Sequence, residues 1–387
     1  MLYFWYRSAA GTCDDSKARC SNRQTGLCSR SDMHIIAAMT PKSYLLLTTV
    51  VLTLALLVAC EPLAPAQTPV YIVVTGETPE TTPPLAEGTP AAAASTPQPA
   101  APGVAGVVNT LAPSPTPTPV ATALPSPTPF KCAEASGRVI QYTVASAITA
   151  TEVVNYVYLP PCFYDSLQRY PYVILLHGTG YDNGMWVDLG APSVMDQGIA
   201  SDTLPPMVLV MPDGGLLAEL NDQPDDASFE TVILNELIPS LERDFCLWGS
   251  REGRAIGGIS RGGFWAFSIA LRHPDVFSAV GGHSPHFEPD NAGPDFNPLD
   301  LAARPNPALS ALRIYLDHGA NDYVAANVRR LSDLLRQNGI AHDYFIDPVG
   351  AHDMNYWTSH VAEYLSFYGQ RWPHDIAALP SCLEPSP

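Results

Sequence analysis

Proline is distributed so unevenly along this chain that it limits which part can fold as a domain. Seventeen of the 39 Pro lie between residues 61 and 130, a stretch without Lys, Arg or Cys that is dominated by Pro, Thr, Ala and Ser. Proline removes backbone hydrogen-bond donors, and this composition leaves few side chains to bury. We therefore expect 61–130 to be an extended, disordered linker. About 257 residues, 131–387, remain for one folded domain.

Short apolar runs alternate with helical patterns throughout 131–387. The central runs, such as VILLHG and MVLVMP, are continuous, which is typical of strands buried on both faces. The alternation predicts an α/β fold with an eight-stranded, mostly parallel sheet and helices on both faces. The expected strands are 138–145, 151–158, 171–177, 206–211, 254–258, 278–283, 311–316 and 342–346, and the expected helices are 228–243, 262–272, 323–338 and 355–369.

The charge balance excludes one class of partner. The chain has 20 Lys+Arg and 38 Asp+Glu, a formal net charge of −18 with His neutral. The expected domain alone carries 14 basic and 31 acidic residues, and Lys131 is its only Lys. Such a surface suits a solvated extracellular protein and offers little to an anionic polymer, so no nucleic acid partner is expected.

An apolar segment near the N-terminus predicts export. Residues 44–59 carry no charge, follow Lys42 and end directly before Cys60. The segment is short for a membrane span but has the length of a signal-peptide core. Its end, Leu-Val-Ala-Cys, resembles the bacterial lipobox, in which the Cys is lipidated and becomes the first mature residue. We expect 39–60 to be a lipoprotein signal peptide that anchors the chain outside the cytoplasmic membrane; the alternative, an uncleaved anchor helix, has the same topology.

Residues 1–38 have no place upstream of such a signal. Met39, followed by a short segment with Lys42, is the simpler start, so we expect 1–38 to be a mis-assigned extension. Beyond Cys60, the chain keeps an even number of cysteines, which in an exported protein suggests two disulfides with three possible pairings. These are Cys132, Cys162, Cys246 and Cys382.

A G-x-S-x-G motif marks the first candidate for chemistry. Residues 258–262 read Gly-Ile-Ser-Arg-Gly and stand between an expected strand and an expected helix. At such a turn the Ser adopts a strained backbone, and Gly on either side allows neighbouring backbone to pass close. The hydroxyl then projects at a helix N-terminus, where the dipole favours developing negative charge. Ser260 is therefore the expected nucleophile.

A serine hydroxyl needs a base, and the base needs an orienting acid. In this strand-turn-helix arrangement, the chain order is Ser, Asp or Glu, His. Asp322 lies in the loop after one expected strand, and His352 lies in a loop before the final helix. We expect these two as acid and base, with Asp317 as the competitor for the acid. His283 and His286 are further candidates to line the pocket.

Acyl transfer also needs two backbone donors for the negatively charged oxygen of the intermediate. The amide of Arg261 is expected to be one, and the amide of Thr179, in the loop after a buried strand, the other, with Gly180 as second choice. The His177 side chain is expected to hold the shape of this loop. The substrate pocket is expected to include Gly180, Trp186 and Trp265, and the further aromatic candidates are Tyr181, Phe287 and Trp357.

These motifs together resemble the esterase D-like esterase family of the α/β-hydrolase superfamily. The matching stretches run in order from about 135 to 370 and include RYPYVILLHGTG, MPDGG, AIGGISRGGFWAFSIALRHPDVF, LDHGAND and GAHDMNYW. The resemblance implies an α/β-hydrolase fold and a serine hydrolase with Ser260, Asp322 and His352 as triad. It does not fix the substrate, since the family spans feruloyl, acetylxylan and siderophore esterases, S-formylglutathione hydrolases and mycolyl-type acyltransferases. Arg261 departs from relatives, where Met or another residue is common; its guanidinium could cap the pocket, bind a substrate carboxylate or form a salt bridge beneath the turn.

The family's topology also bears on the cysteines. Its second strand runs antiparallel to the rest, which implies that all four cysteines lie at the end of the sheet away from the site. On this basis we expect Cys162 to pair with Cys246 and Cys132 with Cys382.

The sequence therefore predicts a lipid-anchored, extracytoplasmic serine esterase that acts through an acyl-enzyme and needs no metal or organic cofactor. Its expected substrate is a small-molecule or carbohydrate-linked ester. Two alternatives stay open: acyl transfer to a sugar hydroxyl, as in mycolyltransferase-like relatives, and a non-catalytic surface binding protein.

Overall fold

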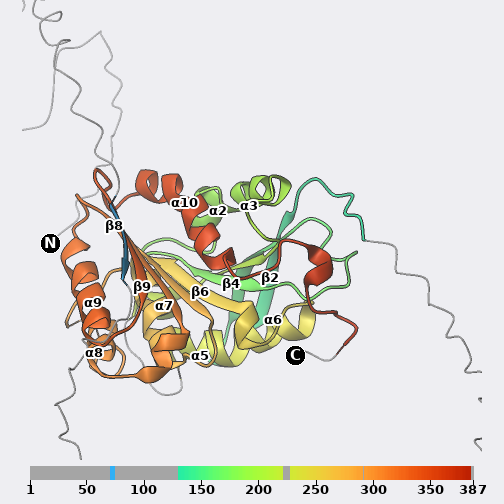
Figure 1. The fold of residues 1–387 in the computed structure, drawn as a ribbon. Helices are drawn as coiled ribbons and strands as arrows, with labels where there is room; N and C mark the ends of the chain where they lie inside the picture. Colours follow the sequence, from blue (N-terminus) through green and yellow to red (C-terminus); the bar gives the residue numbers. More distant parts are fainter. Residues whose placement is uncertain (1–69, 75–129, 221–226, 291, 385–387) are drawn as a thin grey trace, which may run out of the picture. The chain divides into compact units, whose positions relative to one another are not determined.

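The alternating pattern folds into a single mixed sheet. The computed structural model describes residues 70–74, 130–220, 227–290 and 292–384, and its nine strands have the order β1-β9-β8-β7-β6-β4-β5-β3-β2 (Figure 1). β4 to β9 are parallel where they pair, β3 is antiparallel to β2 and β5, and β1 is antiparallel to β9. The strands are β1 (Val70–Val74), β2 (Arg138–Ala145), β3 (Glu152–Leu159), β4 (Tyr172–Leu176), β5 (Val208–Pro212), β6 (Arg254–Ile259), β7 (Ala279–His283), β8 (Arg313–Gly319) and β9 (His342–Asp347).

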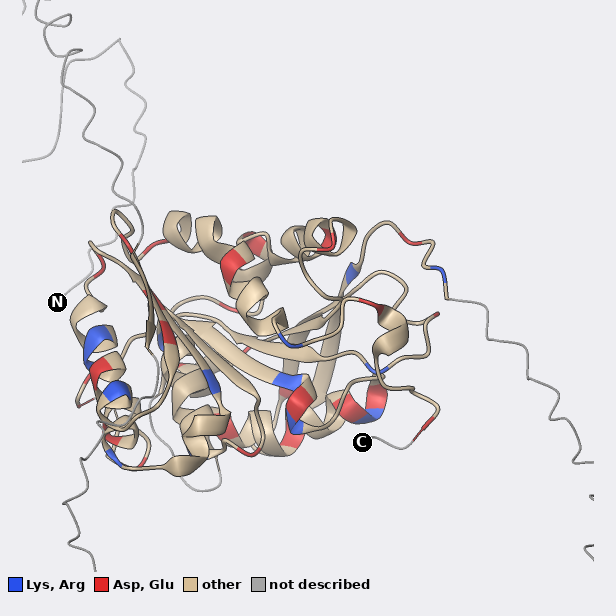
Figure 2. Cartoon of the chain, in the orientation of Figure 1, with Lys and Arg blue, Asp and Glu red and all other residues tan. Residues whose placement is uncertain are grey.

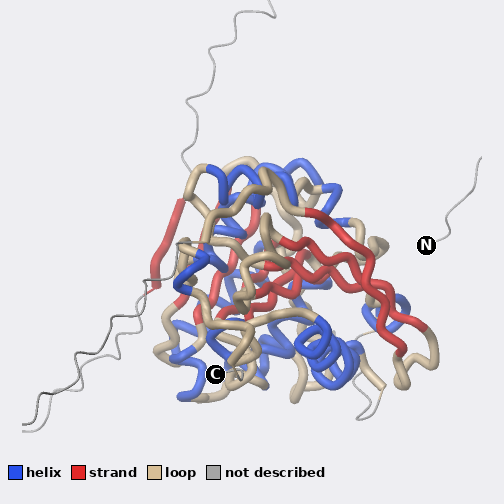
Figure 3. The backbone as a smooth tube through the Cα atoms, turned by 90° about the vertical axis from the view of Figure 1, so that its right-hand side faces the viewer, coloured by secondary structure: helices blue, strands red, loops and turns tan. Residues whose placement is uncertain are grey.

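Helices cover both faces of the sheet (Figure 3). The central strands β4, β5 and β7 are buried along their whole length, which explains their continuous apolar sequence. One face buries an apolar cluster that includes Phe264 and Leu331, and the other buries a cluster that includes Trp186 and Tyr364. The first face carries α5 (Phe229–Thr231), α6 (Ile238–Asp244), α7 (Arg261–Arg272), α8 (Pro298–Ala303) and α9 (Ala325–Gln337); the second carries α2 (Met185–Asp188), α3 (Ala191–Ala200) and α10 (Met354–Gly369).

The predicted α/β class is confirmed, and each of the eight expected strands is found with boundaries within three residues. The strand count was wrong, because β1 adds a ninth strand from the stretch expected to be linker. Its sequence, VYIVV, is a β-branched and aromatic run, which suits a strand. It pairs from Val70 opposite Ile346 to Val74 opposite His342. The linker expectation is therefore corrected for these five residues, and the rest of 61–129 lies outside the described residues, as do 1–60.

One expected helix is interrupted. The pattern over 228–243 predicts a continuous helix, whereas the structure has α5, a π-helical turn at Val232–Leu237 and then α6. Pro239 has no N–H, so the carbonyl four residues earlier loses its α-helical donor. The chain adapts to this missing hydrogen bond by forming the wider π-helical turn just before the proline.

Charged side chains are spread over the described elements. Lys and Arg are few and stand among Asp and Glu on α6, α9 and the loops (Figure 2). No helix in the described part of the chain is long and apolar enough to cross a membrane.

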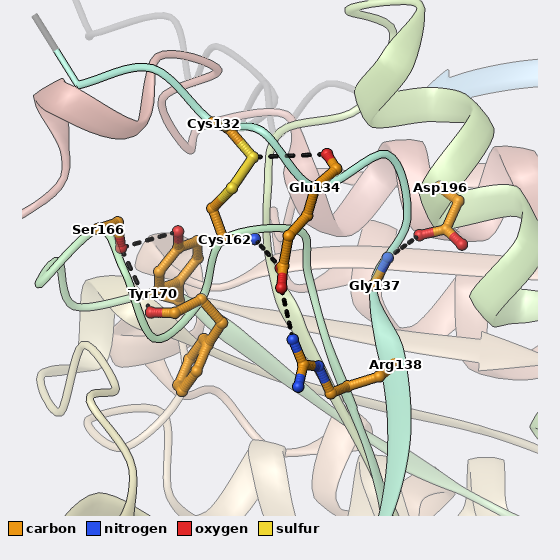
Figure 4. The surroundings of a disulfide bond; sticks show 9 residues. Cys132, Glu134, Gly137, Arg138, Cys162, Ser166, Tyr170 and Asp196 are labelled. Atoms are coloured by element: carbon orange, nitrogen blue, oxygen red, sulfur yellow. Dashed lines mark hydrogen bonds and ion pairs between the residues drawn. A yellow bond between two sulfur atoms is a disulfide. The ribbon is translucent and has the colours of Figure 1, made fainter.

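The disulfide pairing differs from the one expected. Cys132 bonds to Cys162, with their Cα atoms 5.6 Å apart. β2 and β3 form an antiparallel pair in which Arg138 faces Leu159, so the residues before β2 lie beside the residues after β3. Glu134 reinforces this junction, since its carboxylate accepts the N–H of Cys162 and pairs with Arg138 (Figure 4). The expectation failed because it used the antiparallel direction of the second strand only to place the cysteines at one end of the sheet, and did not use the direct pairing of β2 with β3.

The second disulfide joins Cys246 to Cys382, with a Cα–Cα distance of 5.9 Å. The carbonyl of Cys246 accepts the N–H of Tyr170, and the N–H of Cys382 donates to the carbonyl of Leu167. The segment 167–170 therefore brings the two cysteines together. The expected pairs Cys162–Cys246 and Cys132–Cys382 were wrong.

Removing each disulfide should destabilise the domain according to the loop that it closes. The sequence separations are 30 residues for Cys132–Cys162 and 136 for Cys246–Cys382. Chain entropy alone gives losses in unfolding free energy of about 3.5 kcal/mol for C132S/C162S and about 5 kcal/mol for C246S/C382S. Urea denaturation of the two double variants would measure this. The reverse order, or a Cys162–Cys246 peptide in a non-reducing digest, would contradict the account.

Candidate active site

Ser260 occupies the turn between β6 and α7 with a backbone φ of 54°. This is the strained conformation that the G-x-S-x-G motif predicts. The glycines permit it: a Cβ on Gly258 would lie 2.4 Å from the backbone of Gly262, and one on Gly262 would lie 2.4 Å from the carbonyl oxygen of Leu176. The Ser260 amide donates to the carbonyl of His283, which ties the turn to β7. The motif therefore lies where the sequence predicts it.

Three side chains from separate loops meet at this turn. The Oγ of Ser260 lies 2.9 Å from Nε2 of His352. The Nδ1 of His352 lies 3.0 Å and 3.1 Å from the two carboxylate oxygens of Asp322. Asp322 follows β8, and His352 stands between β9 and α10. The carboxyl ends of parallel strands share one edge of the sheet, which is why these residues meet despite their separation in sequence.

The surroundings of Asp322 favour its ionised form. Burial would by itself raise the pKa of this carboxyl, but the hydrogen bonds from His352 and from the Val324 amide lower the pKa overall. A carboxylate facing Nδ1 orients the imidazole with Nε2 toward Ser260. The rings of Tyr323 and Trp357 flank His352 at centroid distances of 4.5 Å and 5.0 Å.

Asp317, the competing acid, belongs to a different cluster. It is fully buried and accepts hydrogen bonds from His283 and from the hydroxyls of Tyr356 and Tyr364. The two tyrosines come from α10, and Nε2 of His283 bonds the hydroxyl of Tyr368 on the same helix. Asp317 therefore fastens α10 to β7 and β8. His283 lies in the core and does not line the cavity beside Ser260.

The loop after β4 lies beside Ser260. His177 accepts the N–H of Gly214 with Nε2, and its Nδ1 lies 2.9 Å from the carbonyl of Gly178. This gives His177 the expected loop-holding position. Thr179 and Arg261 are joined through their side chains, since Nε of Arg261 donates to Oγ1 of Thr179 at 2.9 Å.

An open cavity of about 640 Å³ lies next to Ser260 and His352. Trp186 and Trp265, which the sequence placed in the pocket, do not line it. Both are at most 1% exposed, and their indole N–H groups donate to the carbonyls of Leu176 and Ala218. A large aromatic that finds such a partner is stable in the core, and Phe287 is buried as well. The lining residues are Gly178, Thr179, Tyr181, Ser260, Arg261, His286, Tyr323, His352, Asp353, Met354, Asn355 and Trp357.

Gly180 is also absent from this lining, and its N–H donates to Glu219. Tyr181, His286 and Trp357 do line the cavity, as the sequence analysis allowed. Tyr323 was missed, although it directly follows the expected acid and so shares its loop. Its ring is 66% exposed, which makes it the most accessible aromatic at the cavity.

The residues that the structure describes contain no group of three or more His, Cys, Asp or Glu arranged to hold a metal ion.

Comparison with known proteins identifies the family. The family model described as "Putative esterase" matches residues 146–368, more than half of the chain. The chain belongs to this esterase family. The expected resemblance to an esterase family is thus confirmed.

Two curated relatives share part of the domain. The chain is 31% identical over 157 residues to an endo-1,4-beta-xylanase/feruloyl esterase of Xylanibacter ruminicola, covering 38% of this chain and 21% of the relative. It is 32% identical over 144 residues to Esterase Rv1288 of Mycobacterium tuberculosis, covering 36% and 30%. The matched region thus spans less than a third of either relative.

Solved structures agree on the fold. A ferulic acid esterase aligns with a TM-score of 0.56 and 24% identity, covering 61% of this chain and 99% of its own. The S-formylglutathione hydrolase FrmB of Staphylococcus aureus aligns with a TM-score of 0.53 and 18% identity, covering 60% and 98%. At these identities the likeness supports the architecture alone.

Substitution of Asp322 should affect mainly activity, whereas substitution of Asp317 should affect mainly stability. D322N should lower kcat by about 10²- to 10⁴-fold with little change in folding, because the imidazole loses its orienting carboxylate. D317N should lower the unfolding free energy by about 3 kcal/mol, because a neutral amide replaces the carboxylate that accepts the buried hydrogen bonds of His283, Tyr356 and Tyr364, and it should lower the kcat of the folded enzyme far less than D322N does. Ester-hydrolysis kinetics combined with urea denaturation would measure both. An active D322N beside an inactive, stable D317N would reverse the assignment.

Proposed function

We propose that the chain is a serine carboxylic-ester hydrolase that acts through an acyl-enzyme on Ser260. The observation that carries the proposal is the continuous hydrogen-bonded series from Ser260 through His352 to Asp322 beside an open cavity. Membership of an esterase family supports the same reaction class. Within it, Ser260 is the nucleophile, His352 the base and Asp322 the orienting acid.

The reaction follows from these positions. Nε2 of His352 takes the proton of Ser260 as Oγ attacks the ester carbonyl carbon. The carbonyl π electrons move to oxygen, and the amides of Arg261 and Thr179 stabilise that negative charge. The intermediate collapses, the bond to the alcohol oxygen breaks, and the leaving group takes the proton from His352. Water then attacks the acyl-enzyme with the same base, which frees the acid and restores Ser260.

The cavity favours an acyl group with an aromatic ring. Tyr181, Tyr323 and Trp357 line it together with His286, and aromatic side chains stabilise aromatic ligands through stacked or edge contacts. Two similar proteins are named as a feruloyl esterase and a ferulic acid esterase. We therefore propose hydroxycinnamoyl-type esters, including those on carbohydrates, as substrates.

We also propose display outside the cytoplasmic membrane through lipidation of Cys60. Cys60 and its signal lie outside the described residues. Palmitate labelling that is lost in C60A would test the anchor.

Hydrolysis of methyl ferulate and p-nitrophenyl acetate by the full chain tests the activity. S260A should lower kcat by at least about 10⁴-fold, because the nucleophile is lost. It should also abolish labelling by a fluorophosphonate. S310A, which removes an exposed hydroxyl that bonds only its local turn, is the matched control and should behave as wild type.

The outcomes distinguish the alternatives. Turnover of both esters by S260A would overturn the proposal, and an unlabelled wild-type protein that is folded would favour a binding function. A higher kcat/KM for methyl acetate than for methyl ferulate would overturn the aromatic preference alone.

A further inference from the structure

A carboxylate outside the triad holds the loop that carries one proposed oxyanion donor. α4 (Gly215–Glu219) follows β5 and ends at Glu219. One oxygen of Glu219 accepts the N–H of Gly180 at 2.9 Å. The other lies 3.6 Å from Nε of Arg261, the residue after the nucleophile. A single side chain thus contacts both segments that would supply the oxyanion donors.

The geometry fixes Thr179 from two sides. Its side-chain oxygen accepts the hydrogen bond from Arg261, and the next N–H along the chain is held by Glu219. Gly180 has a φ of +75°, a conformation that glycine adopts without strain. The turn therefore depends on external contacts to hold one orientation. Since the N–H of Gly180 is engaged by Glu219, Thr179 is the better placed donor of the two that the sequence suggested.

Contacts with neighbouring elements hold α4 in place, and this fixes the position of the Glu219 backbone. The N–H of Gly214 donates to His177, and the indole N–H of Trp265 donates to the carbonyl of Ala218. A Cβ on Gly214 would lie 2.2 Å from that of Ala218, which shows how closely the turn into α4 is packed. These contacts join α4 to the loop after β4 and to α7.

Charge balance explains why a carboxylate is tolerated beside a site for negative charge. An isolated anion there would raise the energy of the oxyanion. The guanidinium of Arg261 offsets it, and both side chains are only partly buried, at 19% exposure for Arg261 and 31% for Glu219. Arg261 is thereby engaged within the protein, which corresponds to the salt-bridge alternative.

We propose that Glu219 is a positioning residue for the oxyanion hole, acting through Gly180 and Arg261. This inference rests on the proposed acyl-enzyme mechanism. A donor that is displaced or reoriented costs transition-state stabilisation, whereas binding of the ground-state ester depends on it less. Loss of Glu219 should therefore appear in kcat and not in KM.

Steady-state kinetics of E219A and E219Q in the full chain test the proposal. E219A removes both contacts and should lower kcat about 10- to 100-fold with KM changed less than about threefold. E219Q keeps an acceptor oxygen for Gly180 and should stay within about threefold of wild type. The rate of phosphonylation of Ser260 by a fluorophosphonate should fall in E219A in parallel with kcat, because the phosphonyl oxygen uses the same donors.

Two further variants keep the test interpretable. E236A removes a carboxylate that also accepts loop amides, those of Ala147 and Ile148, and should leave kcat unchanged. T179V replaces the hydroxyl that Arg261 bonds, on an exposed residue, and should also lower kcat. It therefore serves as the test if E219A does not fold.

The results separate this inference from the function on which it rests. If wild type lacks turnover that depends on Ser260, the proposed function fails first. If wild type is active and folded E219A or T179V matches it in kcat and phosphonylation rate, the positioning role is overturned. An equal loss in E219A and E219Q would also overturn it, since the acceptor to Gly180 would then not matter.

Discussion

The close approach of α7 to the central strands is the constraint on which the site depends. Gly258 and Gly262 leave no room for a side chain, and their absence of Cβ lets the turn at Ser260 pass against the end of β4. This places the hydroxyl at the carboxyl edge of the sheet. It also brings the loop after β4 beside the first amide of α7. A side chain at either glycine would separate the nucleophile from the proposed donors.

The position of His352, the proposed base, depends on a second interaction, the buried cluster around Asp317. His352 lies two residues before Met354, the first residue of α10, so contacts that fix this helix also restrict the position of the imidazole. Tyr356, Tyr364 and Tyr368 tie α10 to Asp317 and His283. Gly257 and Gly281 make this possible, because a Cβ on either would collide with the hydroxyl of Tyr368. The paired glycines in β6 and β7 thus act on the site indirectly, by making room for Tyr368 of α10, whereas Asp322 contacts His352 directly.

Sequence reasoning predicted the strands and the meeting of Ser260, Asp322 and His352 because each follows from a local rule. Continuous apolar runs indicate buried parallel strands, and the carboxyl ends of parallel strands lie at the same edge of the sheet. Residues that follow these strands are therefore expected to meet there. The disulfides were mispredicted because their pairing depends on which antiparallel neighbours meet, as for Cys132 and Cys162. Trp186 and Trp265 were misplaced because an aromatic near a motif in sequence can point to the core. Glu219 and β1 were missed because their partners, Gly180 and β9, are distant in the chain.

The central claim is that Ser260 forms a covalent tetrahedral species whose oxygen is bound by the amides of Arg261 and Thr179. A crystal structure of the protein after reaction with an aryl fluorophosphonate tests it most directly. The account predicts phosphorus bonded to Oγ of Ser260, with the phosphonyl oxygen about 3 Å from both amide nitrogens and the aryl group toward Tyr323. A phosphonyl oxygen directed to solvent, or bound by the Gly180 amide with Glu219 displaced, would contradict it.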